Sequence, residues 1–169
     1  MASSLKNLSD YNAEEVPSGK GKKIGIVVAE WNSDITFKLH EGCVEALQKH
    51  DVKEQDIYTK VVPGSFELPF AAKAVLVEEK VDAVICLGCV IKGETDHDIY
   101  INQSVASAIM QLGLMTDKPF IFGVLTPNNQ EQAQDRAGGK HGNKGVEAAI
   151  TALKMIHIKK EKRQSMGFK

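Results

Sequence analysis

The densest group of chemically capable residues follows an apolar run at 83–90. The segment from Gly88 to Asp98 reads GCVIKGETDHD and places a glycine, a threonine and a histidine close together. Thr95 and Asp98 have the spacing of a capping box, which predicts a helix capped by Thr95. Free N–H groups at such a start can bind an anion, although a plain capped helix is the alternative interpretation.

His97 follows directly, in the first predicted turn of that helix. Histidine exchanges protons near neutral pH, so it is a candidate general acid–base at the exit of a loop. A surface histidine near a helix start is the alternative, and the local pattern alone does not separate the two.

A second loop, VPGSFELP at 62–69, contains two prolines and a glycine, which predict a rigid turn into a helix. Phe66 could stack on a planar ring, and Glu67 could accept hydrogen bonds from ring N–H groups or hydroxyls. Packing in the core and a favourable place near a helix start are the alternatives. Trp31, the single tryptophan, follows another apolar run and is either a stacking platform or a packing residue.

Arg136 and Lys144 flank a glycine-rich turn near the end of the chain. They are either solvated charges or anion ligands, and in the second case they could serve a neighbouring subunit. Cys86 and Cys89 form a CxxC pattern, but residues three apart on a strand point to opposite faces. With no second CxxC nearby we predict no metal site and interpret both as core cysteines.

The elements that position these residues follow from hydrophobic periodicity. Apolar runs at 23–29, 57–62, 83–90 and 120–125 predict strands buried on both faces, and stretches with helical spacing lie between them. This order predicts a three-layer α/β/α sandwich with a four-stranded parallel sheet, flavodoxin-like. Ligands bind beyond the carboxyl ends of such strands. The loops at 30–32, 63–67, 89–97 and 126–129 should therefore meet.

Capping residues, prolines and glycines predict where the helices begin and end. Asn32 and Ser33 are candidate caps of the first long helix. Thr126 and Pro127 predict the start of a short helix at 128–137, which two glycines end.

Composition excludes several classes of protein. The chain has 169 residues, 43% hydrophobic and 25% charged, which suits one globular domain and not a disordered chain or a coiled coil. A net charge of −1 argues against nucleic-acid binding, and no apolar run approaches the roughly 20 residues of a membrane helix. We expect a soluble cytoplasmic protein with an arm at 1–20, one domain at 21–158 and a basic, solvated tail at 159–169.

Five segments, taken in order, resemble the lumazine synthase family of riboflavin biosynthesis. They are KIGIV with the following WN, VPGSFELP, GCVIKGETDH, FIFGVLT, and RAG with GNKG, and the resemblance spans about 23–156. It implies condensation of 5-amino-6-(D-ribitylamino)uracil with 3,4-dihydroxy-2-butanone 4-phosphate, which releases phosphate and two waters. The resemblance implies no metal or organic cofactor.

The resemblance also implies a role for each matching residue. His97 would transfer protons. Substrate would be bound by Trp31, Ser65, Phe66, Glu67, Cys89, Val90, Ile91 and Phe122. Phosphate would be bound by Glu94, Thr95, Lys144 and the Arg136 of an adjacent subunit. Three residues depart from the family pattern: Trp31 replaces a frequent phenylalanine, Glu94 a small residue and Asp98 a frequent aromatic. The Glu94 carboxylate should then point away from the phosphate.

The resemblance further implies a homopentamer with active sites between subunits. The short connection at 138–145 favours a 60-mer shell, whereas Pro17 and the long arm favour smaller assemblies. Such a shell could enclose riboflavin synthase, and the arm could add a strand to the sheet of a neighbour. A non-catalytic lumazine- or flavin-binding protein and a cage-forming protein on the same fold are the alternatives.

Overall fold

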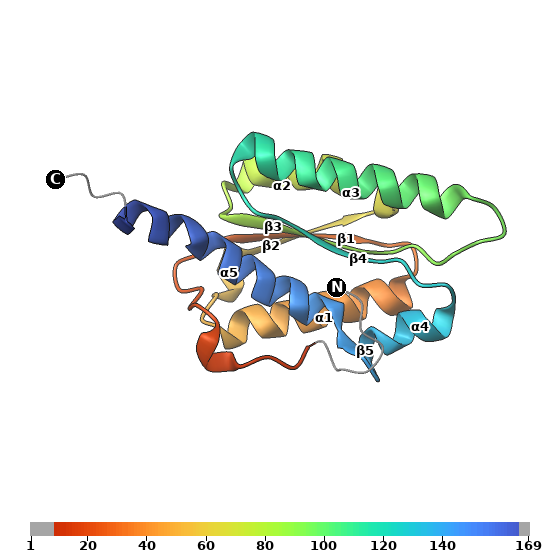
Figure 1. Cartoon of the computed structure of the whole chain (residues 1–169), viewed down its shortest axis with the longest axis horizontal. Helices are drawn as coiled ribbons and strands as arrows, with labels where there is room; N and C mark the ends of the chain where they lie inside the picture. The colour runs from red at the N-terminus through yellow and green to blue at the C-terminus, as the bar shows by residue number, and fades with distance from the viewer. Residues whose placement is uncertain (1–8, 166–169) are drawn as a thin grey trace.

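The structure, a computed structural model, describes residues 9–165, with side chains up to residue 158. A parallel sheet lies in the middle, with strands β1 (Ile24–Ala29), β2 (Ile57–Val62), β3 (Ala83–Cys89) and β4 (Phe120–Leu125) in the order β2-β1-β3-β4. Helices α1 (Ser33–Lys49) and α5 (Lys144–Ser165) cover one face, and α2 (Leu68–Glu79) and α3 (His97–Thr116) cover the other (Figure 1). The predicted fold class is confirmed.

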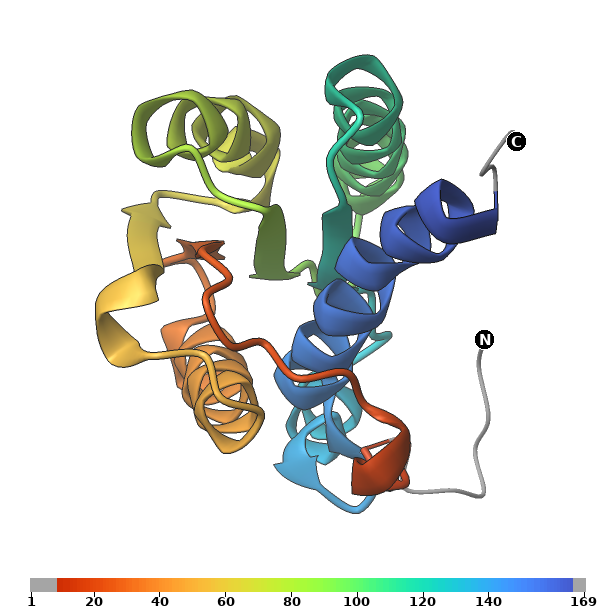
Figure 2. The same ribbon diagram turned by 90° about the vertical axis from the view of Figure 1, so that its left-hand side faces the viewer.

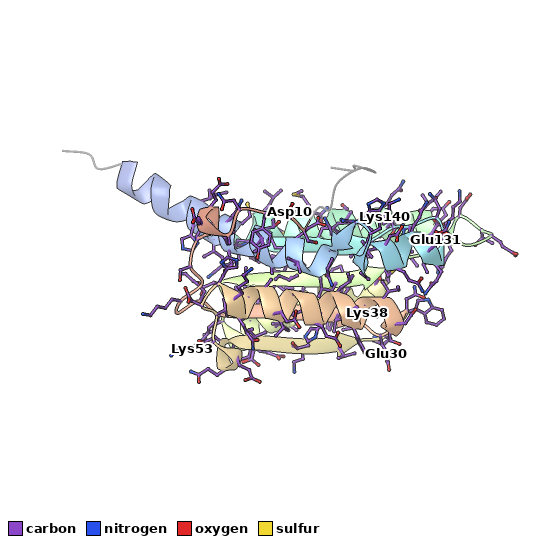
Figure 3. All side chains as sticks on the ribbon, turned by 90° about the horizontal axis from the view of Figure 1, so that it is seen from below. Asp10, Glu30, Lys38, Lys53, Glu131 and Lys140 are labelled. Atoms are coloured by element: carbon purple, nitrogen blue, oxygen red, sulfur yellow. The ribbon has the colours of Figure 1, made fainter. Side chains whose placement is uncertain are left out.

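Two hydrophobic cores hold the layers together, one on each face of the sheet. Ile26 and Ile85 point toward α1 and α5, where Leu39 is fully buried, while Val84 and Cys86 pack toward α2 and α3. Each large side chain buried in this way contributes about 1.5–3 kcal/mol to folding. Charged residues such as Lys38 and Glu131 project outward from the layer below the sheet (Figure 3).

Strand β2 departs from the expectation of burial on both faces. Residues 59–61 are exposed, and Val61 keeps 56% of its surface accessible. The reason is its position at the edge of the sheet, where only β1 pairs with it. The polar residues in the middle of the run, Thr59 and Lys60, suit such an edge.

Two predicted helix starts differ from the structure, and a third lies where it was predicted but lacks the expected capping hydrogen bond. Helix α3 begins at His97 with Asp96 at the cap position, and no described side chain caps it, so the capping box at Thr95 is wrong. Asn32 does occupy the cap position of α1, but in a left-handed conformation (φ 60°) and without a capping hydrogen bond from its side chain. The start predicted at Thr126 is also wrong, because α4 (Gln130–Asp135) begins after Asn129.

The glycine-rich turn after α4 folds into a small antiparallel hairpin that the sequence did not predict. Its strands are β5 (Ala137–Gly139) and β6 (Gly142–Asn143), and Gly138 and Gly142 have the positive φ values that favour glycine. Helix α5 follows at once and continues to Ser165, so the predicted tail begins as helix. Its solvation concerns side chains outside the described residues, and the three domain bounds stay predictions.

Part of the predicted arm packs against its own chain. Val16 is buried, the Tyr11 hydroxyl lies 3.1 Å from His50 Nε2, and the Gly19 N–H donates to the His50 carbonyl at 2.7 Å. Figure 2 shows this red segment crossing the end of the layer formed by α1 and α5. Strand addition to a neighbour remains a prediction for the arm at 1–20, of which residues 1–8 lie outside the described residues.

Candidate functional site

The loops after β1, β2 and β3 are joined at the carboxyl edge of the sheet. The Trp31 N–H donates to the Pro63 carbonyl at 3.0 Å, and Asn32 Nδ2 donates to the Cys89 carbonyl at 2.9 Å. This second bond explains why the Asn32 side chain does not cap α1. The strand order reverses between β1 and β3, and such a reversal opens a crevice beyond the strand ends.

The loop after β4 is tied to the loop after β3. The Val90 N–H donates to the Leu125 carbonyl at 2.8 Å, and the Lys92 N–H donates to the Pro127 carbonyl at 3.0 Å. Because this pairing holds Pro127 beside the neighbouring loop, the helix expected there begins later. All four loops predicted from the strand order therefore meet at one edge.

A cavity of about 570 Å³ opens at this edge. It brings together most of the residues that the sequence singled out, namely Trp31, Ser65, Phe66, Glu67, Cys89, Val90, Ile91, Thr95 and His97. Two carboxylates, Glu67 and Asp98, line it, and no lysine or arginine of the described chain does. The cavity thus offers hydrogen-bond acceptors and aromatic surface, but no cation of its own.

Two aromatic side chains lie unusually open in the lining. Trp31 is 73% exposed and Phe66 is 60% exposed, so neither serves mainly as core packing. Large aromatic rings at the mouth of a cavity present flat faces on which a planar ligand can stack. This geometry favours the stacking interpretation of both residues over the packing alternative.

The loop after β3 carries the candidate phosphate and proton-transfer residues. Thr95 and His97 line the cavity and are exposed, whereas Glu94 is exposed but lies outside the lining. The backbone around Gly93 is open, because a Cβ placed there would meet nothing within 4 Å. A small group can therefore approach the backbone at Gly93 without a steric obstacle.

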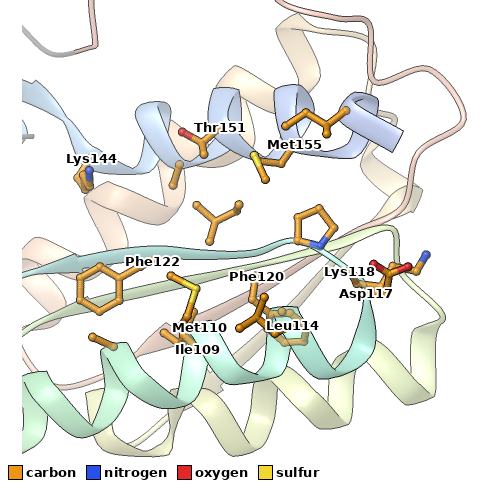
Figure 4. Close-up of a pocket in the computed structure, with 16 residues that line it drawn as sticks. Ile109, Met110, Leu114, Asp117, Lys118, Phe120, Phe122, Lys144, Thr151 and Met155 are labelled. Carbon is orange, nitrogen blue, oxygen red and sulfur yellow. The ribbon is translucent and has the colours of Figure 1, made fainter. Parts of the chain in front are cut away.

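Phe122, Arg136 and Lys144 lie elsewhere. Phe122 and Lys144 line a second cavity of about 510 Å³ between α3 and α5, which is mostly apolar (Figure 4). Arg136 Nη1 lies 2.7 Å from Glu147 Oε1, and Lys144 Nζ lies 3.1 Å from Glu147 Oε2. One chain therefore does not bring these three residues to the first cavity.

Known proteins similar to this chain decide its family. A sequence profile described as 6,7-dimethyl-8-ribityllumazine synthase matches residues 21–160. The chain belongs to the 6,7-dimethyl-8-ribityllumazine synthase family. The family resemblance drawn from the five motifs is thereby confirmed, as are the expected enzyme, a transferase, and its place in riboflavin biosynthesis.

Relatives that carry this name cover almost the whole chain. The 6,7-dimethyl-8-ribityllumazine synthase of Parabacteroides distasonis is 52% identical over 158 residues, covering 94% of this chain and 99% of that protein. That of Cytophaga hutchinsonii is 55% identical, covering 92% and 98%. That of Flavobacterium johnsoniae is 49% identical, covering 99% and 88%.

The described residues also limit what else this lumazine synthase family member carries. No group of three His, Cys, Asp or Glu side chains among them could hold a metal ion. Within 9–165, no helix is both long and apolar enough to cross a bilayer.

The three cysteines are buried core residues, and only Cys89 also lines the cavity. Cys86 and Cys89 are buried, and burial raises the pKa of each thiol to about 12. Burial also raises the pKa of the Cys43 thiol, because the charged thiolate is poorly solvated in the core. All three are free thiols that stay protonated at neutral pH, so Cys89 lines the cavity without offering a nucleophile.

Alkylation of the native enzyme tests this assignment. Iodoacetamide at pH 8 is expected to leave all three thiols unmodified in the folded enzyme and to modify them fully in denaturant, as counted by mass spectrometry. The pH lies far below the raised pKa values, so the reactive thiolate is scarce. Rapid labelling of Cys89 at pH 8 in the folded state would contradict a purely structural role.

The absence of a side chain at Gly88 leaves the space that Ser65 occupies in the lining of the cavity. Ser65 is buried, and a Cβ at position 88 would lie 2.5 Å from Ser65 Oγ and 3.1 Å from Leu68 Cδ1. We expect Gly88→Ala to displace the 63–67 loop, weaken pyrimidine binding about tenfold, and destabilise the fold by about 1–3 kcal/mol. Ligand titration and thermal unfolding measure both effects, and Gly93→Ala, where the Cβ has free space, is the matched control for unfolding.

Six residues line the cavity that the sequence did not single out as site residues: Asn32, Pro63, Gly64, Gly93, Asp98 and Ile101. The signal for Asn32 was present, since it adjoins Trp31, but it was interpreted as a helix cap. Asp98 was interpreted as the partner of Thr95 in a capping box and as a departure from the family pattern, not as a site residue. Ile101 shares a helix face with Asp98 and His97, which a count of turns from His97 could have shown.

Proposed function

We propose that the first cavity condenses 5-amino-6-(D-ribitylamino)uracil with 3,4-dihydroxy-2-butanone 4-phosphate, releasing phosphate and two waters. The observation that supports this most is the convergence of His97, Trp31 and the 65–67 loop in one cavity. The reaction needs a platform for a planar ring, an anion site and a proton shuttle. Each requirement corresponds to residues of that lining.

The pyrimidine stacks on Trp31, with Phe66 at the other loop. Glu67 accepts hydrogen bonds from ring N–H groups or ribityl hydroxyls, and Ser65 and the backbone at 89–91 hold the remaining ring edge. Aromatic stacking of this kind is worth about 0.5–1.5 kcal/mol beyond the area it buries. The exposure of Trp31 and Phe66 in a chain with few aromatics supports this placement.

The phosphate is bound by the loop around Gly93, Glu94 and Thr95, mainly through backbone N–H groups, and by a cation from a second subunit. The described lining of the cavity has no lysine or arginine, so a cation must come from outside it. Arg136 and Lys144, held by Glu147 on the same chain, supply it to a neighbour's site. His97 then transfers protons during imine formation and elimination.

An exposed apolar face supports the same division of the site between subunits. The second cavity lies among exposed apolar side chains, including Met110, Leu114 and Met155 at 65%, 77% and 41% exposure. An apolar face of this kind marks an interface. A neighbouring copy covers it in a homopentamer, which brings Phe122, Arg136 and Lys144 toward an adjacent site.

The short connection between β5 and β6 also bears on how pentamers assemble further. We infer a cytoplasmic 60-mer shell, because the connection between β5 and β6 is short, and this shell could enclose riboflavin synthase. Light scattering or analytical ultracentrifugation distinguishes the shell from a free pentamer. A free pentamer at all protein concentrations would contradict the shell and the enclosure.

A turnover assay tests the proposed reaction. The purified chain is mixed with both substrates, lumazine formation is followed by fluorescence, and a protein-free blank measures unaided condensation. Acceleration well above the blank supports the enzyme. Tight binding of the pyrimidine without acceleration would instead support a non-catalytic lumazine- or flavin-binding protein.

A further inference from the structure

Asp98 lies in the wall of the first cavity beside His97, and one of its carboxylate oxygens is left without a partner. The side chain is half-buried, and its Oδ1 is buried with no hydrogen-bond partner among the described residues. Burying a charged oxygen without a hydrogen bond is unfavourable, so native proteins seldom keep one without a reason.

Asn102 lies one helical turn after Asp98 and shows the same feature. Its Oδ1 is also buried without a hydrogen-bond partner within the described chain. Residues four apart on a helix are surface neighbours. The oxygen and nitrogen of an amide have nearly the same shape, so turning the Asn102 amide over exchanges Oδ1 for Nδ2. In that orientation Nδ2–H can donate to Asp98 Oδ1, four residues earlier on the same helix.

We propose that Asp98, oriented by Asn102, is a further substrate-contacting residue of this cavity. It accepts a hydrogen bond from an N–H or O–H of a substrate. This inference rests on the proposed function. With Oδ1 bonded to Asn102, Oδ2 is the carboxylate oxygen that is left for a ligand in the cavity. Asp98 is the ligand-binding group of the pair, and Asn102 is a positioning residue.

The charges of the cavity indicate what Asp98 contacts. A carboxylate repels phosphate and attracts hydrogen-bond donors. Asp98 therefore keeps the phosphate at the Gly93–Thr95 side and takes a donor from the rest of the substrates. Donors of this kind occur on both substrates: amino and ring N–H groups on the pyrimidine, and hydroxyls on the butanone.

Binding and steady-state kinetics of Asp98 variants test the proposal. Quenching of Trp31, the single tryptophan and part of the lining, reports pyrimidine binding without turnover. We expect Asp98→Ala to weaken pyrimidine binding, or to raise KM for the butanone phosphate, by about 10-fold or more. The substrate whose binding is weakened is the one that donates the hydrogen bond to Asp98. Asp98→Asn keeps the shape of the side chain and an acceptor oxygen, so it should weaken substrate binding less than Asp98→Ala does.

Asp96 provides the matched control. It lies two residues earlier, is exposed, and is outside the lining of the cavity. Asp96→Asn removes the same charge from the same loop and should change Kd and KM by no more than about twofold. If Asp96→Asn and Asp98→Asn weaken binding equally, the effect is one of general charge and the proposal is overturned.

A double-mutant cycle tests whether Asn102 acts through Asp98. Asn102→Leu removes the donor and is expected to weaken binding of the same substrate, but by less than Asp98→Ala does. In the Asp98→Ala background, Asn102→Leu should then cause no further loss. Additive losses would contradict the positioning role, because they would show that Asn102 acts independently of Asp98.

Failure of this proposal and failure of the proposed function give different results. If the parent enzyme binds the pyrimidine but forms no lumazine, the proposed reaction fails while the titrations of Asp98 variants still decide the contact. If Asp98→Ala unfolds, as judged by circular dichroism, the isosteric Asp98→Asn carries the comparison. Unchanged Kd and KM for both substrates in a folded Asp98 variant overturn the proposal.

Discussion

Replacing His97 with alanine is expected to lower kcat of the condensation by about 10²–10⁴ while leaving pyrimidine binding within about threefold of the parent enzyme. His97 is the one imidazole in the described lining of the cavity, in the first turn of α3. The carboxylates there are acceptors suited to binding, and the Cys89 thiol stays protonated. Proton transfer during imine formation and elimination therefore depends on this ring.

The measurement is steady-state turnover for kcat, with Trp31 quenching for pyrimidine binding. His157→Ala is the control, because His157 lies on α5, outside that cavity, where its Nδ1 contacts the Leu153 carbonyl of its own helix. Its kcat should match that of the parent. A His97→Ala enzyme with full kcat would show that another group, or solvent, carries the proton.

Arg136→Ala is expected to raise KM for the butanone phosphate by about 10- to 100-fold, since it removes a charge-assisted contact to phosphate. The more decisive result concerns mixed assemblies. Subunits carrying His97→Ala and subunits carrying Arg136→Ala, each weakly active alone, should regain activity when assembled together. The reason is the separation in one chain, where Arg136 pairs with Glu147 away from the cavity that holds His97.

Random co-assembly sets the size of this recovery. A site that takes His97 from one subunit and Arg136 from the next is intact in about one quarter of cases in an equal mixture. Refolding or co-expressing the two variants, with mass spectrometry to confirm mixing, gives the measurement. The same variants purified separately and combined without exchange serve as the control. Confirmed mixing without recovery would mean that each site is completed within one chain.

Much of the fold and the centre of the site were predictable from the sequence. The runs at 57–62 and 120–125 match β2 and β4, because apolar β-branched runs between helical stripes have few alternatives in an α/β chain. Parallel strands place their carboxyl ends at one edge, so Trp31, Glu67 and His97 were expected together and do line one cavity.

Tertiary structure alone decided how these local segments end and which side chains remain apart. Asn32 bonds to the Cys89 carbonyl instead of capping α1, and Pro127 pairs with Lys92 instead of starting a helix, because each group found a partner distant in sequence. Strand alternation turned Phe122 toward α3 and the second cavity. Local pattern determines which element a residue joins, whereas contacts across the chain determine what its side chain meets.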